Sequence, residues 1–201
     1  MTLLETRPTA SELLPSDLPY RFTVAQFIDM LESEILPQEG RFELLEGVIY
    51  PLSPIFDGHY AGVTRLNNEL ALKLSSAVMV SPQNPIAIGE RLSFPQPDLT
   101  VIRRERYTGK IPTPEEVSLV IEVSDATLLK DRSLKTPLYA RHGIPEYWIL
   151  DVKKNQLAES TCSRLEVYRD PHGEEYRSKK ILLEGEFAAL LEFPDVQIQW
   201  W

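Results

Sequence analysis

SLVIEVSDAT, residues 118–127, places one carboxylate, Glu122, inside a run of Leu, Val, Ile and Val. A short apolar run of this kind predicts a strand buried in the interior of a sheet. An unpaired charge is costly to bury, so something must compensate Glu122. This stretch alone leaves three possibilities open: a bound cation, a buried Arg or Lys, or a strand edge that leaves Glu122 in water.

The segments around this strand carry helical and strand patterns in turn. Thr23 and Gln26 form a capping-box pattern that opens a helix over 24–35, and apolar spacings of three and four predict a helix over about 59–78. A helix over 131–141 is closed by Gly143. Strands are expected at 42–50, in two halves around Glu46-Gly47, and at 86–94, 99–102, 118–124, 146–151, 165–168 and 176–183, and a final strand ends in Trp200 and Trp201. This order predicts an α/β (α+β) fold, with a mixed β-sheet flanked by helices.

The bulk properties of the chain limit its class. Its 201 residues suit one domain, expected over residues 21–201 after a flexible leader over 1–20. The net charge of −9 argues against a protein that coats nucleic acid. No apolar run approaches the roughly 20 residues that span a bilayer, and no signal peptide is evident. The single cysteine, Cys162, is interpreted as an incidental loop residue, and a cytoplasmic location is expected.

A second carboxylate precedes a neighbouring strand. Pro97 suits the beginning of a strand, so Asp98 lies at a strand end with its side chain free to project. If the two strands pair, Asp98 and Glu122 converge and repel one another. Mg²⁺ favours one or two carboxylates together with waters and phosphate oxygens, so a bound Mg²⁺ (or Mn²⁺) would compensate both. Pairing of Glu122 with a protein cation is an equal alternative at this point.

The next helix supplies such a cation. Lys135, Leu138 and Tyr139 lie at i, i+3 and i+4, so they share one helix face that packs inward. A lysine beside a metal site can orient or deprotonate the attacking water and stabilise developing phosphorane charge. The alternative is a snorkelling lysine whose stem covers the core.

Four motifs occur in a fixed order over roughly residues 22–152: RFELLEGVIYPLSP followed by His59, then PDLTVI, LVIEVSDAT and DRSLKTPLYARHGIPEYWILD. Together they resemble the Uma-type restriction endonuclease family, a former domain of unknown function in the PD-(D/E)XK nuclease superfamily. The ordered combination is specific, whereas any single motif is weak. The resemblance implies a restriction-endonuclease-like fold.

The resemblance also implies roles for individual residues. Asp98 and Glu122 match the two acidic metal ligands, joined by the carbonyl of Val123. The superfamily usually has a lysine two residues after the second acid, where this chain has Ser124. Lys135 matches a version in which that lysine has moved to the following helix. Glu43 matches an upstream acid that assists the metal through a water.

The expected activity is metal-dependent hydrolysis of phosphodiester bonds in DNA by an endonuclease. Arg103, Arg104 and Lys130 are candidate phosphate contacts, and His59 is a substrate contact or, preferably, a helix-start hydrogen bonder. The alternatives are a catalytically inactive nuclease-fold binding module, favoured by the acidic surface and by Ser124, and a phosphoesterase that acts on RNA or nucleotides. A homodimer is expected, mostly from base rates, with a face formed by Leu157, Leu165, Val167, Trp200 and Trp201.

Overall fold

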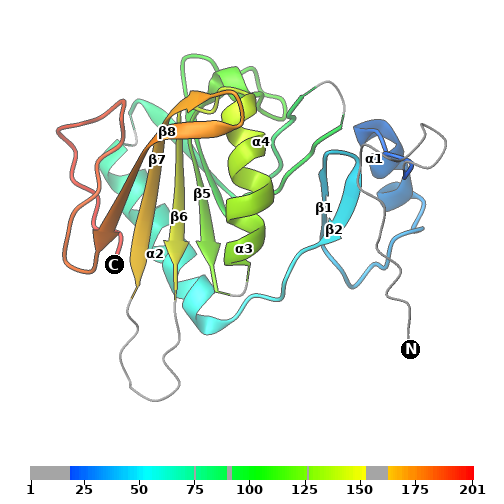
Figure 1. The fold of residues 1–201 in the computed structure, drawn as a ribbon, viewed down its shortest axis with the longest axis horizontal. Helices are drawn as coiled ribbons and strands as arrows, with labels where there is room; N and C mark the ends of the chain where they lie inside the picture. The colour runs from blue at the N-terminus through cyan, green and yellow to red at the C-terminus, as the bar shows by residue number, and fades with distance from the viewer. Residues whose placement is uncertain (1–18, 75, 90–91, 126, 153–162) are drawn as a thin grey trace, which may run out of the picture.

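The computed structural model describes residues 19–74, 76–89, 92–125, 127–152 and 163–201, and its centre is a six-stranded sheet (Figure 1). The strand order is β3-β4-β5-β6-β7-β8, with β5 and β6 parallel and the other neighbours antiparallel. A mixed sheet flanked by helices is the fold class that the sequence predicted. The strands are β3 (Val78–Pro82), β4 (Leu99–Arg103), β5 (Val117–Ser124), β6 (Glu146–Asp151), β7 (Arg164–His172) and β8 (Glu175–Leu183).

Helices cover both faces of this sheet. On one face, α2 (Asp57–Leu74) packs Leu66 and Leu70 against β5 and β6. On the other face lies one longer helix made of α3 (Leu128–Lys130), a π-helical segment (Asp131–Lys135) and α4 (Thr136–Arg141). It connects the parallel pair β5 and β6, as a parallel connection requires. All eight residues of β5 are therefore buried, Glu122 included.

The N-terminal part forms a separate unit beside the main sheet (Figure 1). Helix α1 (Val24–Glu32) has the predicted capping box between Thr23 and Gln26. It is followed by the hairpin of β1 (Phe42–Leu45) and β2 (Val48–Pro51), which turns at Glu46-Gly47 as predicted. A bridge from Leu44 to Phe94 ties the hairpin to the body of the protein. This contact directs the side chain of β1 residue Glu43 toward the main sheet.

Three predicted elements differ in the structure. Among the described residues of the strand predicted at 86–94 there are only two isolated bridges, Ile88 to Ser93 and Phe94 to Leu44, because prolines flank the segment and Gly89 takes φ +70°. Strand β3 was missed because its apolar residues continue the pattern of the preceding helix, which ends at Leu74. The final strand is replaced by a C-terminal segment with a single bridge, between Ala188 and Ile198.

The predicted dimer face is wrong for Leu165, Val167 and Trp200, which are buried. Leu165, Val167 and Trp200 are 0%, 5% and 0% exposed, and Trp201 packs against the same core. The C-terminal segment covers this face of β7, which is why these side chains are buried. The homodimer therefore stays a prediction without a surface.

Other predictions fall outside the described residues or stay untested. Leu157, Cys162 and residues 1–18 of the expected leader lie outside the part of the chain that the structure describes. The single-domain assignment of residues 21–201 stays a prediction. Among the described residues, no helix is both long enough and apolar enough to cross a bilayer.

Candidate metal and catalytic pocket

The register of the central strands brings the two predicted metal ligands together. Leu99 of β4 pairs with Ile121 of β5, so one further step places Asp98 opposite Glu122 on the same face. The backbone N–H of Val123 donates to Asp98 Oδ2 at 2.8 Å. Both carboxylates line one pocket at this end of the sheet.

This pocket is small and strongly charged. Its volume is about 60 Å³, which holds about four waters, or an ion with its waters, but no nucleotide. The scissile group would therefore enter from the mouth while the rest of a substrate stays outside. The charged lining residues are Arg41, His59, Asp98, Glu122, Asp125, Lys130, Asp131 and Lys135.

Glu122 has one protein cation and several acidic neighbours. It is 4% exposed, and its Oε1 accepts from Lys135 Nζ at 2.9 Å and from the hydroxyl of Tyr139 at 3.0 Å. Burial raises the pKa of Glu122 well above its ordinary value, and the nearby Asp131, Asp98 and Glu43 raise it further against the effect of Lys135. The sequence left open whether a protein cation or a metal compensates Glu122. The structure contains the protein cation, but Lys135 alone does not balance this carboxylate.

Lys135 is shared among three carboxylates. It is 2% exposed, and its Nζ lies 2.9 Å from Glu122, 3.1 Å from Glu43 and 4.0 Å from Asp131. Burial lowers the pKa of Lys135, but Glu122, Glu43 and Asp131 outweigh burial and raise the pKa above its ordinary value. A lysine whose pKa is raised favours its protonated form and is a poor acceptor of a proton from water. The geometry therefore suits an electrostatic and positioning role rather than a general base.

The π-helical segment explains how two lysines reach the same carboxylate. Glu43 Oε1 lies 2.9 Å from Lys130 Nζ, and its Oε2 lies 3.1 Å from Lys135 Nζ. Residues five apart on a regular α-helix point about 140° away from each other. Here the N–H of Thr136 donates to the Asp131 carbonyl, a five-residue turn that brings both lysines to one side. Pro137 favours this turn because it has no N–H to donate to the carbonyl four residues earlier.

Glu43 joins the N-terminal unit to the pocket. It is completely buried, and its Oε2 also accepts from the backbone N–H of Gln96 at 3.3 Å. Burial raises the pKa of Glu43, but Lys135 and Lys130 outweigh burial and leave the pKa below its ordinary value. Glu43 is thus an ionised carboxylate bound by two lysines.

Sequence reasoning missed Asp131 as a site residue. It is 2% exposed, and its Oδ2 accepts from the hydroxyls of Ser124 and Thr127, the latter at 2.8 Å. Ser124 therefore holds an acid that faces Lys135. Asp131 lies four residues before Lys135, and that helical spacing could have revealed it.

The sequence placed Tyr139 on the inward helix face without a role at the site, and in the structure its hydroxyl donates to Glu122. Its spacing of four from Lys135 was the available signal, because both residues share one helix face.

His59 contacts Asp98 rather than the helix start. Its Nε2 lies 2.9 Å from Asp98 Oδ1, an ion-pair contact. Burial lowers the pKa of His59, but the interaction with Asp98 outweighs it and raises the pKa above its ordinary value. Both oxygens of Asp98 therefore have partners within the chain, Val123 and His59.

The candidate phosphate contacts separate into two groups. Lys130 lines the pocket. Arg103 lies at the far end of β4, about 17 Å from Asp98 at 3.4 Å per residue, and donates to the Val117 carbonyl at 2.8 Å. Arg104 donates to the Val78 carbonyl at 3.1 Å. The structure does not bring either arginine to the pocket.

The donor set fits a hard divalent cation with few protein ligands. In the described part of the chain, no group of three or more His, Cys, Asp or Glu side chains is arranged to hold a metal. Asp98, Glu122 and the Val123 carbonyl would therefore leave several coordination positions to water and phosphate. That is the mode in which Mg²⁺ is usually bound.

Comparisons with known proteins place this geometry in a family context. The family model Uma2, described as "Putative restriction endonuclease", matches residues 24–200. The crystal structure of a "putative nuclease belonging to DUF820 from Anabaena variabilis ATCC 29413" matches with a TM-score of 0.62 and 14% sequence identity. That match covers 89% of this chain and 95% of the other, and it demonstrates a shared fold. A search of curated proteins found no match.

Proposed function

The chain belongs to the Uma2 family, and from that premise we propose that it is a metal-dependent endonuclease that hydrolyses phosphodiester bonds in DNA. One observation carries the proposal: Asp98 and Glu122 converge in a small pocket beside the buried, positively charged Lys135. Two acids and a lysine around one point suit the hydrolysis of a phosphate ester, in which negative charge develops on oxygen.

In this proposal, Asp98, Glu122 and the Val123 carbonyl would hold Mg²⁺ or Mn²⁺, which would supply Lewis-acid polarisation of the phosphate and a lower pKa for water. Lys135 orients the attacking water and offsets the charge that develops on the phosphorane. Tyr139 orients the Glu122 carboxylate through its hydrogen bond.

Two acids support the lysine. Glu43 and Asp131 keep Lys135 protonated and fixed in place, since both lie within 4.0 Å of its Nζ. A positioning residue of this kind acts through the lysine and needs no contact with the substrate.

A cleavage assay on closed circular DNA tests the proposal. A circular substrate has no ends, so a product shows endonuclease action. We expect cleavage that requires Mg²⁺ or Mn²⁺ and falls about 1000-fold in Asp98→Asn, because loss of roughly 4 kcal/mol of transition-state stabilisation has that effect. Asp125→Asn is the matched control, since Asp125 lines the same pocket without contacting Glu122 or Lys135 in the structure.

Equal cleavage by wild type and Asp98→Asn would exclude this active site. RNA and nucleotide substrates in the same assay address the phosphoesterase alternative.

An inactive binding module remains the second candidate, because His59 and Val123 already engage both oxygens of Asp98. Metal binding without cleavage of any substrate would favour that module.

A further inference from the structure

A second buried glutamate lies on the same face of the sheet as Glu122. Glu166 of β7 is completely buried and accepts hydrogen bonds from Arg132 Nε at 3.1 Å and from the Tyr168 hydroxyl at 2.6 Å. Lys179 Nζ lies 2.9 Å from it, and Arg164 Nε lies 3.7 Å away. These three basic residues around Glu166 form the β7 cation cluster: Arg132, Arg164 and Lys179.

This cluster lies two strands from the candidate active site. Glu122 pairs with Ile149 of β6, and Ile149 pairs with Glu166 of β7, so the two glutamates occupy one row of the sheet. Strands are about 4.8 Å apart, which separates them by about 10 Å. This is the separation within the sheet, and on the outside the helix that runs from α3 to α4 covers the row between the two glutamates.

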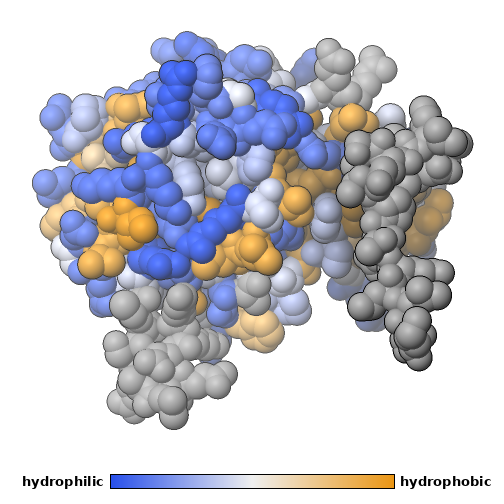
Figure 2. Space-filling model, in the orientation of Figure 1, coloured by the Kyte–Doolittle hydropathy of each residue, from blue (hydrophilic) through white to orange (hydrophobic). Residues whose placement is uncertain are grey.

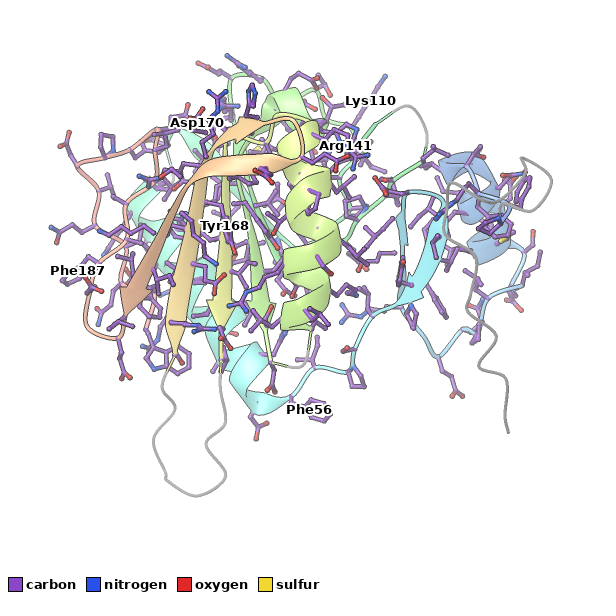
Figure 3. The ribbon with its side chains drawn as sticks, in the orientation of Figure 1. Phe56, Lys110, Arg141, Tyr168, Asp170 and Phe187 are labelled. Carbon is purple, nitrogen blue, oxygen red and sulfur yellow. The ribbon has the colours of Figure 1, made fainter. Side chains whose placement is uncertain are left out.

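The cluster is open to solvent on the helix-covered face. The side chains of Arg132, Arg164 and Lys179 are 35%, 32% and 40% exposed. Tyr168, beneath Lys179, faces the viewer beside the helix (Figure 3). Figure 2 shows hydrophilic and hydrophobic surface interleaved over this side of the molecule.

The cluster has more positive charge than its carboxylates neutralise, and more N–H donors than the described residues accept. Three cations face two carboxylates, Glu166 and Asp151, which leaves one net positive charge in a chain of net charge −9. Among the described residues, Arg164 hydrogen-bonds only through its Nε, to Asp151. Its two terminal nitrogens have no acceptor among the described residues, and neither does one terminal nitrogen of Arg132.

Glu166 holds the cluster in place. Burial raises its pKa, but hydrogen bonds from Arg132, Tyr168 and Lys179 outweigh burial and lower the pKa of Glu166 to about 2. The carboxylate is therefore ionised at any ordinary pH and orders the cations before any ligand arrives. Preorganised cations lose less conformational entropy on binding than free surface lysines do.

We propose that the β7 cation cluster binds the phosphate backbone of the DNA strand that leaves the catalytic pocket. The path runs from the pocket past Lys130 and across the helix to Arg132, Arg164 and Lys179. These contacts would position the DNA without reading its sequence. The inference rests on the proposed function, because the DNA it binds is the substrate of that site.

The test measures DNA affinity against salt in Asp98→Asn, which binds without cutting. Each phosphate contact contributes about 0.9 to the slope of log K against log salt. Lys179→Gln should reduce that slope by about 0.9, and Lys179→Gln with Arg164→Gln by about 1.8. Lys180→Gln is the matched control, because Lys180 is the neighbouring exposed residue on the opposite face of β8, paired with Val167. It should leave the slope unchanged.

The outcomes separate this inference from the proposed function. Equal slopes for Lys179→Gln, Lys180→Gln and the Asp98→Asn protein without further changes would refute DNA binding by the β7 cation cluster. Asp98-dependent cleavage by the wild type would still support the proposed nuclease activity. If the wild type neither cuts nor binds DNA at low salt, the proposed function fails and the cluster assignment fails with it.

Discussion

Glu122 and Glu166 are two buried glutamates in one row of one sheet, covered by one helix, yet their surroundings are opposite in charge. Glu122 has Lys135 as its one cation and lies close to Asp98, Asp131 and Glu43, and its pKa is raised. Glu166 lies among three cations and a tyrosine hydroxyl, and its pKa is lowered to about 2. Both side chains are buried, at 4% and 0% exposed, so burial alone does not distinguish the two environments.

The difference shows what to ask of a buried acid. A carboxylate whose charge the protein balances, such as Glu166, stabilises the fold and needs nothing further. A buried carboxylate that has one lysine but several acidic neighbours, such as Glu122, lowers the stability of the fold unless a further cation binds. This under-compensation at Glu122, more than its burial, supports a metal in the pocket.

The largest expected effect is on the rate of cleavage and comes from Lys135, which forms an ion pair with Glu122. Lys135→Gln should lower cleavage about 1000-fold, because it removes the charge that offsets the phosphorane. Metal affinity should stay or rise, since a competing cation leaves the ligands. Lys130→Gln is the control: it also contacts Glu43 but does not contact Glu122, and should cost no more than about tenfold. Comparable losses in both variants would contradict a special role for Lys135.

The second effect is on stability and has opposite signs at the two glutamates. Glu166→Gln should lower the free energy of unfolding by about 3 kcal/mol, since it leaves clustered cations without their carboxylate. Glu122→Gln should leave that free energy unchanged or raise it. Lys135 still forms its ion pair with Glu43, and the substitution removes a buried carboxylate that lies beside other acids. Urea denaturation of the three proteins measures both. Equal destabilisation would remove the contrast between the two sites.

The pH dependence sharpens the same contrast. The lowered pKa of Glu166 means that its stabilisation is complete above about pH 4.5 and is lost as pH falls toward 2. The destabilisation by Glu166→Gln should therefore shrink between pH 6 and pH 3, by about 1 kcal/mol after solvent screening of the partly exposed cations.

Glu122 behaves in the opposite sense. Its raised pKa makes the ionised form a burden that grows as pH rises above 4.5, so the Glu122→Gln variant should gain relative stability with pH. Parallel pH profiles for the Glu122 and Glu166 variants would show that the two environments are alike.

The smallest expected effect concerns the hydroxyl on Glu122. Tyr139→Phe should lower cleavage about tenfold through misorientation of the carboxylate, with little change in stability. Tyr147→Phe is the control, because Tyr147 is equally buried and its hydroxyl has no hydrogen-bond partner among the described residues. Identical rates for the two variants would mean that Tyr139 only packs against Tyr147.

The sequence predicted the parts of the site that depend on local pattern. Helical spacing placed Lys135 inward, and apolar strands around Glu122 predicted its burial. Strand pairing brought Asp98 to Glu122, although the role of each residue stays a prediction. The mixed sheet flanked by helices also followed from the order of the elements, because strongly periodic segments fix helix and strand type.

Features that depend on tertiary packing could not be predicted. The distance of Arg103 from the pocket follows from strand direction, which local sequence does not give. Leu165 and Val167 look like surface residues until the C-terminal segment is folded over them. The π turn that aligns Lys130 with Lys135 needs the packing of the whole helix, although Pro137 was the local sign of it. Glu166 lies in the strand predicted at 165–168, and the sequence did not indicate its burial or its cationic partners.

The most direct test of the central claim is calorimetric titration of Mn²⁺ and Mg²⁺ into the wild type, Glu122→Gln and Glu166→Gln. The comparison between the two glutamates predicts one bound ion in the wild type, none in Glu122→Gln and one in Glu166→Gln at unchanged affinity. Circular dichroism of each variant confirms that it is folded. Binding that survives Glu122→Gln would contradict the account, because Lys135 alone would then compensate the acid in the central strand.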